Sequence, residues 1–342
     1  MRMKFLAPLR IPIERRIQTL SVLIFVLLFL QFFAIITLYT LIRLLFTDYF
    51  WISLSYALWL YFDWETPRQG GRLKKWMREL KIWKYYADYF PIHLIKTCDL
   101  DPNRNYLMCV SPHGILCFGI FGNFATEATN FSDKYPGITP HILTLNAQFI
   151  SPMTRDLLLL GGICSASEKS IRYILNNNGE NCKQKGQAAI LVIGGVAEML
   201  EVQVDTYTLV LKKRTGFVRV ALETGTPLVP IFSFGENNSY YTFNTKKTTP
   251  FKKFQTWWKD FFTFKFPIFY GRGIFNYKFG WLPFRDPIYT VVGRPIEIPK
   301  IEKPTKEDID KYHQIYLNEL TQLFNEHKDK YLKNKNTILE II

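Results

Sequence analysis

One histidine stands in a sequence context where it could act as a general base. His113 follows the apolar run 105–110 and lies between Pro112, which restricts the backbone, and Gly114, which lets a ligand approach the main chain closely. A neutral imidazole with a pKa of about 6.5 can take a proton from an alcohol at physiological pH. The alternative interpretation of a histidine at a strand end is a structural hydrogen-bonding role.

A second motif joins paired glycines to a carboxylate. Gly194 and Gly195 come directly after the apolar run 188–193, and Glu198 follows closely. Glycines in this position leave backbone N–H groups free to face an oxyanion or a phosphate. The carboxylate could orient an imidazole or cap a helix, and the alternative is a tight turn with a solvated glutamate.

Basic side chains could hold the phosphates of a large anionic cosubstrate. Those we single out are the run 212–214, which ends in Arg214, together with Arg219 and, separately, Arg155. A solvated charged face also explains such a run. We predict no metal site, because Cys117 stands four residues after His113 without further obvious zinc ligands. The cysteines form no CxxC pair and are predicted to be free thiols in a reducing compartment: Cys98, Cys109, Cys117, Cys164 and Cys182.

The segments that position these motifs alternate between strands and helices. Several of the strands are apolar throughout, which is typical of a sheet covered on both faces. We therefore predict an α/β fold with a mostly parallel sheet flanked by helices. The predicted strands are 105–110, 142–145, 188–193, 206–211 and 228–234, and the predicted helices are 115–129, 151–162, 215–224 and an amphipathic terminal helix over 305–330.

A transmembrane helical hairpin is predicted before this domain. The run 20–42 contains no charge and, at about 1.5 Å per residue, is long enough to cross the hydrocarbon core of a bilayer. A second apolar run, 44–62, is interrupted only by Asp48 and either spans or re-enters. Both flanks are basic, which places both on the cytosolic side. The predicted regions are a basic cytosolic N-terminus over 1–19, a membrane-embedded hairpin over 20–62 and a cytosolic domain over 63–342.

The formal net charge of +14 suits nucleic acid, anionic membrane surfaces or phosphate-bearing substrates. Much of the excess flanks the apolar runs, where membrane topology accounts for it, so we predict no nucleic-acid partner. Residues 240–285 interleave aromatic and basic side chains, which favours a surface at the bilayer interface. An aromatic core segment and stacking on single-stranded nucleic acid are the alternatives.

Taken in order, short motifs over nearly the whole chain resemble the type-2 diacylglycerol acyltransferase family, which also holds monoacylglycerol and wax-alcohol acyltransferases. The usual family signature is His-Pro-His-Gly, and here Ser111 takes the first position. Related glycerolipid acyltransferases carry Asp five residues after the histidine, but this chain has Phe118 there, so another group must orient the imidazole. The motifs are 15–19, 88–91, 104–106, 112–114, 123–129, Pro152 with Arg155, Gly194-Gly195 with Glu198, 214–218, 230–231, 234–237 and 292–296.

The resemblance implies a glycerolipid-acyltransferase-like fold and an acyl-CoA-dependent O-acyltransferase at the endoplasmic reticulum membrane that also meets lipid droplets. Acyl-CoA would be a cosubstrate, and no cofactor is implied. The predicted acceptor is diacylglycerol, which gives triacylglycerol. Monoacylglycerol, a wax alcohol, and a non-catalytic lipid-binding membrane scaffold are the alternatives, and a homo-oligomer stays open. The predicted catalytic residues are His113 and Glu198, and the predicted substrate-binding residues are Pro112, Gly114, Arg155, Gly194, Gly195 and Arg214.

Overall fold

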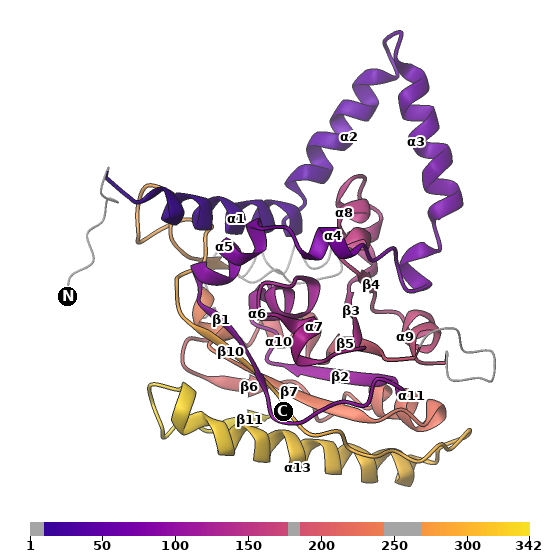
Figure 1. Ribbon diagram of the computed structural model, residues 1–342, viewed down its shortest axis with the longest axis vertical. Coiled ribbons are helices and arrows are strands. Elements are labelled where there is room, and N and C mark those ends of the chain that lie inside the picture. Colours follow the sequence, from indigo (N-terminus) through magenta and orange to yellow (C-terminus); the bar gives the residue numbers. More distant parts are fainter. Residues whose placement is uncertain (1–9, 177–184, 243–267) are drawn as a thin grey trace, which may run out of the picture.

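The computed structural model of the protein describes residues 10–176, 185–242 and 268–342. A seven-stranded sheet lies at its centre, with strand order β1-β10-β7-β2-β5-β3-β4 (Figure 1). Neighbouring strands run parallel except β10 against β7, so the predicted α/β fold with a mostly parallel sheet is confirmed. The strands are β1 (Ile92–Lys96), β2 (Tyr106–Ser111), β3 (Thr139–Thr144), β4 (Ile163–Ser165), β5 (Gln187–Val192), β7 (Leu228–Phe234) and β10 (Ile288–Val292).

The central strands are mostly apolar because both faces of the sheet are covered. In β2, Tyr106, Met108 and Val110 join one hydrophobic core, whereas Leu107 and Cys109 join the other. Figure 1 shows α1 and α5 above the sheet and α13 below it. The first core is closed by α1 (Ile13–Phe29), α5 (Ile82–Tyr89) and α8 (Thr154–Leu160), and the second by α9 (Glu168–Leu175), α11 (Gly216–Thr224) and α13 (Lys306–Tyr331).

Four predicted strands and the helices over 215–224 and 305–330 are confirmed to within a few residues. The remaining strand, β6 (Tyr207–Leu209), lies outside the main sheet and pairs with β11 (Leu339–Ile341). Sequence reasoning missed β1, β4 and β10. The other short elements are η1 (Thr66–Arg68), α4 (Lys75–Arg78), α7 (Phe131–Lys134), η3 (Asn146–Phe149), α10 (Gly195–Met199), η4 (Glu236–Ser239), β8 (Tyr241–Thr242) and β9 (Phe269–Tyr270).

Two predicted helices needed correction. The helix over 115–129 is confined to α6 (Phe118–Ile120) and the short π-helix η2 (Phe121–Ala125), because Cys117 adopts φ 54 before it and Thr126 is extended after it. The helix expected to begin at Ser151-Pro152 begins at Thr154 instead. Its N-cap, Met153, has φ 59 and no capping side chain, so the predicted hydroxyl cap is wrong.

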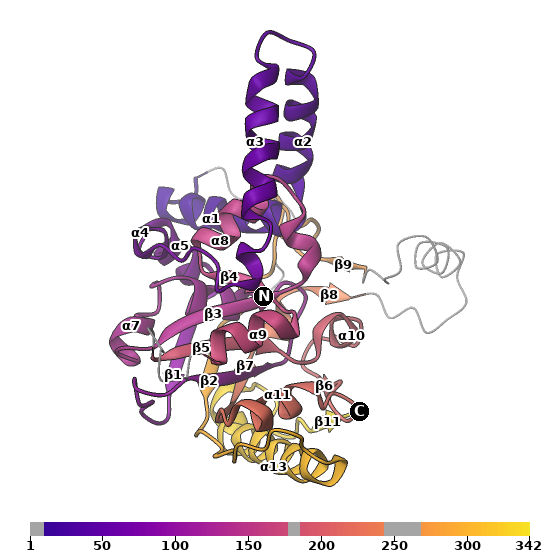
Figure 2. The same cartoon turned by 90° about the vertical axis from the view of Figure 1, so that its right-hand side faces the viewer.

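The first apolar run is not one helix. It is divided at Gln31, whose φ of 66 separates α1 from α2 (Phe32–Leu44). The buried side of α1, including Val22 and Phe25, packs into the domain, whereas α2 and α3 (Phe50–Asp63) project away from it as a hairpin (Figures 1 and 2). Within the described residues no single helix meets the length and hydropathy expected of a membrane span, and only α1 with α2, bent by 62°, meets them together.

Some predictions fall on residues outside the described ranges. They concern Cys182, the extreme N-terminus and the part of the aromatic and basic stretch over 243–267. The prediction of free thiols is confirmed for Cys98, Cys109, Cys117 and Cys164.

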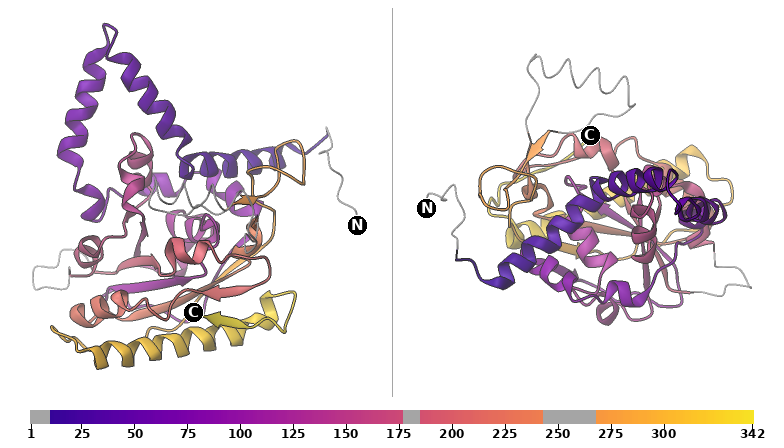
Figure 3. Two further views of the ribbon diagram at one scale, coloured as in Figure 1. Left: turned by 180° about the vertical axis from the view of Figure 1, so that it is seen from behind. Right: turned by 90° about the horizontal axis from the view of Figure 1, so that it is seen from above.

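Figure 3 shows the layers of the fold from behind and from above, with α13 running along the face of the sheet opposite α1.

The start of α13 should contribute measurably to stability. The Thr305 hydroxyl accepts from the Asp308 N–H at 3.2 Å, and the Asp308 carboxylate accepts from the Thr305 N–H at 3.0 Å, which forms a capping box. Thr305→Ala should lower the free energy of unfolding by about 1 kcal/mol, read from a urea midpoint. Thr321→Ala, within the same helix, is the control and should be neutral or stabilising. Equal losses in both variants would contradict the capping role.

Candidate active site

The predicted histidine and glycine motifs meet where two neighbouring strands end. β2 and β5 are parallel, and their register pairs Val110 with Val192, so the chain leaves both strands at one edge of the sheet. Pro112 is buried and follows a cis peptide bond, and Gly114 has φ 61. Gly195, with φ 55, begins α10 on the neighbouring strand end. The tertiary structure therefore brings the two motifs together as one site.

The ring of His113 is held by its own loop. Nδ1 lies 3.0 Å from the carbonyl oxygen of Gly114, which can only accept, so Nδ1 carries the proton and Nε2 presents a lone pair. Burial lowers the pKa of the imidazole, although the Gly114 contact opposes this shift, and the ring is neutral at physiological pH. Among the described residues no group hydrogen-bonds Nε2. The group that orients the imidazole is therefore a main-chain carbonyl.

Glu198 holds the main chain of His113 and not its ring. Its Oε1 accepts from the His113 N–H at 2.6 Å, and its Oε2 accepts from the Val210 N–H at 3.2 Å. A Cβ at Gly194 would lie 2.2 Å from Oε2, so only glycine lets α10 fold back over this carboxylate. Burial raises the pKa of Glu198 to about 7. Glu198 therefore contacts the backbone of His113, and not the imidazole that the sequence suggested it could orient.

The raised pKa of Glu198 predicts a pH-dependent stability. Between its ordinary value of 4.5 and about 7, the unfolded chain ionises while the folded protein keeps the proton, so the carboxyl lowers stability as pH rises through this window. Glu198→Gln removes this titration. The unfolding free energy of the variant minus that of wild type should therefore rise from pH 4.5 to 7, by up to about 3 kcal/mol. Urea titrations of both proteins at several pH values would measure it, and a constant difference would contradict the shift.

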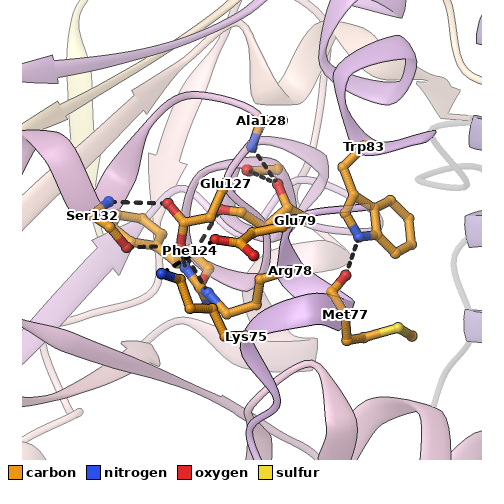
Figure 4. A network of polar contacts seen from close by, with 11 residues as sticks. Lys75, Met77, Arg78, Glu79, Trp83, Phe124, Glu127, Ala128 and Ser132 are labelled. Atoms are coloured by element: carbon orange, nitrogen blue, oxygen red, sulfur yellow. Dashed lines mark hydrogen bonds and ion pairs between the residues drawn. The ribbon is translucent and has the colours of Figure 1, made fainter. Parts of the chain in front are cut away.

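The helix that follows the His113 loop is fixed at its far end by Arg78 of α4. The guanidinium donates to the Phe124 carbonyl at 2.6 Å and to Glu127 Oε1 at 2.7 and 2.9 Å. Glu127 in turn accepts from the N–H and hydroxyl of Ser132, both at 3.0 Å (Figure 4). These contacts satisfy the carbonyl end of η2 and explain why helical structure stops there and not at 129.

Arg155 lies apart from this site. Its guanidinium is 1% exposed and donates to Asp63 Oδ2 at 2.7 Å and to the Asp63 carbonyl. Asp63 ends α3, and its Oδ1 accepts from Arg72 at 2.8 Å. Arg155 therefore ties α8 to the base of the α2–α3 hairpin. This arrangement favours a structural role over the substrate contact that we predicted from the sequence.

The predicted basic residues differ in their availability. Arg214 is exposed just before α11, has no ion pair within the described ranges, and lies close enough to oppose the raised pKa of Glu198. Arg219 instead pairs with Glu168 at 2.6 Å. Of the two, Arg214 has no competing carboxylate among the described residues, which favours it as the contact of an anionic ligand. Within the described part of the chain, no cluster of three or more His, Cys, Asp or Glu side chains is suited to a metal ion.

Two residues of this region were given no role by sequence reasoning. Asp63 lies at the end of an apolar run, and no feature of the neighbouring sequence predicts its ion pair with Arg155. Glu236 stands in a motif that we noted, directly after β7, but its direction could not be read from sequence. The available indication was a carboxylate two residues after a largely apolar strand.

The chain is similar to several acyltransferases. A family model described as diacylglycerol acyltransferase matches residues 42–342. 2-Acylglycerol O-acyltransferase 1 of Bos taurus is 44% identical over 325 residues, which cover 95% of each chain. Diacylglycerol O-acyltransferase 2 of Danio rerio is 44% identical over 328 residues, covering 96% of this chain and 89% of that one. Acyl-CoA wax alcohol acyltransferase 1 of Homo sapiens is 45% identical over 290 residues, covering 85% and 87%.

Among solved structures, the 1-acyl-sn-glycerophosphate (LPA) acyltransferase PlsC from Thermotoga maritima aligns with 12% identity and a TM-score of 0.38. The alignment covers 90% of this chain and 97% of that chain. A TM-score this low carries no argument about the site.

Proposed function

This chain belongs to the diacylglycerol acyltransferase family, and from that membership we propose that it transfers the acyl group of acyl-CoA to the hydroxyl of diacylglycerol. The family supports an acyl-CoA-dependent acyltransferase of acylglycerols or wax alcohols. Relatives named for three different acceptors are similar at 44%, 44% and 45% identity, so monoacylglycerol and long-chain alcohol are the alternative acceptors. The non-catalytic scaffold is disfavoured, because the site retains a neutral histidine with a free ring nitrogen.

The observation that carries the proposal is the geometry of His113. With Nδ1–H donating to the Gly114 carbonyl, Nε2 takes the proton of the acceptor hydroxyl as the oxygen attacks the thioester carbonyl. The tetrahedral intermediate then expels the thiolate of CoA, which receives the proton from the imidazolium. The reaction needs no metal and no cofactor beyond the acyl-CoA cosubstrate.

Backbone donors near the imidazole suit the oxyanion of that intermediate. The His113 N–H is already taken by Glu198. Among the described residues, the N–H groups of Gly114 and Gly195 have no hydrogen-bond acceptor, and both lie at the meeting point of the two strand ends. We assign the oxyanion to these donors, with Glu198 keeping the His113 backbone in place. Arg214 is proposed to contact a phosphate of CoA.

We further propose that the α2–α3 hairpin enters the endoplasmic reticulum membrane and returns to the cytosolic face. Both helices expose large apolar side chains, among them Ile35 at 63%, Tyr61 at 76% and Phe62 at 76%. Helices of 13 and 14 residues reach only about 20 Å, less than the roughly 30 Å hydrocarbon core, which favours re-entry from one side. A hairpin of this kind also suits the single lipid layer around a droplet. A glycan on the exposed sequon at Asn130 would contradict the cytosolic placement.

An acceptor panel tests the enzymatic proposal. Detergent-purified protein is incubated with labelled acyl-CoA and, separately, with diacylglycerol, monoacylglycerol or a long-chain alcohol, and the ester products are resolved. We expect triacylglycerol to form with the highest kcat/KM. Preferential ester formation with another acceptor would select that alternative, and no ester from any acceptor would favour the scaffold.

A further inference from the structure

A second buried carboxylate, Glu236, lies against the His113 loop from the side opposite Glu198's strand. It begins η4 directly after β7, the strand that pairs with β2 on the side away from β5. Gly235 before it has φ 88, which turns the chain back so that the side chain points under the loop. Only 1% of Glu236 is exposed. Loop 112–119 is therefore flanked by one buried carboxylate from each neighbouring strand of β2.

The carboxylate of Glu236 binds the main chain where the loop enters α6. Oε2 accepts from the Gly119 N–H at 2.9 Å. The Ser233 hydroxyl donates to the same oxygen at 3.3 Å and lies 3.0 Å from the Thr290 hydroxyl of β10. Glu236 thus anchors the Gly119 N–H of α6 to β7 and, through the Ser233 hydroxyl, to β10.

The stem of Glu236 packs across Gly114. A Cβ at Gly114 would lie 2.6 Å from Glu236 Cγ, and a Cβ at Gly119 would lie 2.7 Å from Oε2. The backbone at both positions therefore rests directly on this side chain. Gly114 also supplies the carbonyl that accepts from His113 Nδ1. A continuous line of contact leads from Glu236 through Gly114 to the imidazole.

Burying the carboxyl group of Glu236 lowers the stability of the fold. Burial raises its pKa to about 7, and Oε1 has no hydrogen-bond partner within the described part of the chain. A buried carboxyl with one oxygen unpaired is an inefficient way to hold a helix end, since a neutral side chain would satisfy one N–H at lower desolvation cost. The length of the Glu236 side chain, by contrast, lets it contact both Gly114 and Gly119, the two glycines at either end of the loop.

We propose that Glu236 is a positioning residue for His113. By holding Gly114 and the start of α6, it fixes the carbonyl that sets the tautomer and direction of the imidazole. The inference rests on the proposed function, in which Nε2 is the general base. Positioning requires a side chain long enough to reach the loop and an oxygen that accepts the hydrogen bond from the Gly119 N–H. A side chain of equal length should therefore replace Glu236 better than a shorter carboxylate.

Two variants distinguish the contribution of the side-chain length of Glu236 from that of its carboxyl group. Glu236→Gln keeps the length and an amide oxygen for Gly119, and we expect its kcat within about threefold of wild type. Glu236→Asp keeps the carboxyl group but withdraws it from the loop, and we expect kcat to fall about 10- to 100-fold while KM for acyl-CoA and acceptor stays within about twofold. On a His113→Ala background, Glu236→Asp should cause no further loss, because the effect passes through the imidazole.

Asn105→Ala is the matched control. Asn105 is also buried and bonds main chain on both sides, to Leu175 and Gln187, but at the opposite end of β2. It should lower the melting temperature with little change in kcat. A Glu236→Asp kcat equal to wild type, or an equal loss with and without His113, would overturn the positioning role. An inactive wild-type protein would instead reject the proposed function.

A spectroscopic readout does not require activity. In ¹⁵N-histidine-labelled protein, the His113 ring, assigned by comparison with His113→Gln, should show the Nδ1–H tautomer in wild type and in Glu236→Gln. Glu236→Asp should show a mixture of tautomers. The same tautomer in all three proteins would contradict the inference, whatever the acyl-transfer rates are.

Discussion

Replacing His113 with alanine should lower kcat for acyl transfer by about 10²- to 10⁴-fold, the range that general-base catalysis supplies. The reason is local, because the Nδ1–H bond to Gly114 leaves Nε2 as the proton acceptor and no other imidazole shares the loop. Removal of the ring leaves the Glu198 contact intact, since this contact uses the backbone N–H. We therefore expect folding and KM for acyl-CoA to change little. Initial rates with labelled acyl-CoA and thermal melts would measure both.

His327→Ala is the matched control for this prediction. The Nδ1 of His327 also lies 3.0 Å from a main-chain carbonyl, that of Leu323, but on α13 at the opposite face of the sheet. Loss of this imidazole should leave kcat unchanged. Full acyl transfer by the His113→Ala protein would remove His113 from the mechanism, and the neighbouring thiol of Cys117, 3.6 Å from Nδ1, would then be the next group to examine.

Arg155→Ala should lower the free energy of unfolding by about 3–5 kcal/mol, the loss typical of breaking a buried ion pair. The variant leaves Asp63, which is only 8% exposed, with Arg72 as its remaining cationic partner. It also releases the contact between α8 and the end of the hairpin. Because the guanidinium is buried and paired, we expect KM for acyl-CoA to stay within about twofold for the folded protein.

Arg68→Ala is a suitable comparison for the Arg155 variant. Arg68 pairs with Glu65 at 2.6 Å near the same hairpin base, but both side chains are more than a third exposed. Exposed pairs of this kind contribute little to stability, so this variant should unfold at nearly the same denaturant concentration as wild type. Denaturant titration in detergent would give both values. A large rise in KM for acyl-CoA with unchanged stability in Arg155→Ala would restore the phosphate-binding role that the sequence suggested.

The order of elements around the site could be predicted because it depends on local pattern. The largely apolar runs at β2, β5 and β7 indicated strands buried on both faces, and the polar and glycine residues after them indicated a functional edge. Helix boundaries were less predictable. The predicted helix over 115–129 is wrong because Cys117 and Thr126 leave helical geometry. The helical segment between them is held by Glu236 and Arg78, which lie far away in sequence.

The apolar run 20–42 shows the same division. Its composition correctly indicated helical structure, but hydropathy does not distinguish a core helix from a membrane helix. The break at Gln31 is decided by α1 packing on the domain through Val22 and Phe25, which leaves α2 to pair with α3. Composition alone does not predict which half of an apolar run packs against the rest of the protein.

For the candidate active site, the sequence alone determined the chemical groups: a histidine after a buried strand, glycines that free backbone donors, and a carboxylate beside them. Tertiary structure decided their partners. In the folded protein Glu198 accepts from the His113 backbone N–H, and the His113 ring donates to the Gly114 carbonyl. Arg155 pairs with Asp63, and Glu236 accepts from the main chain of the His113 loop. The physical reason is that residue type and spacing set what a group can do, whereas the direction of a buried polar side chain depends on unpaired groups brought near it only by folding.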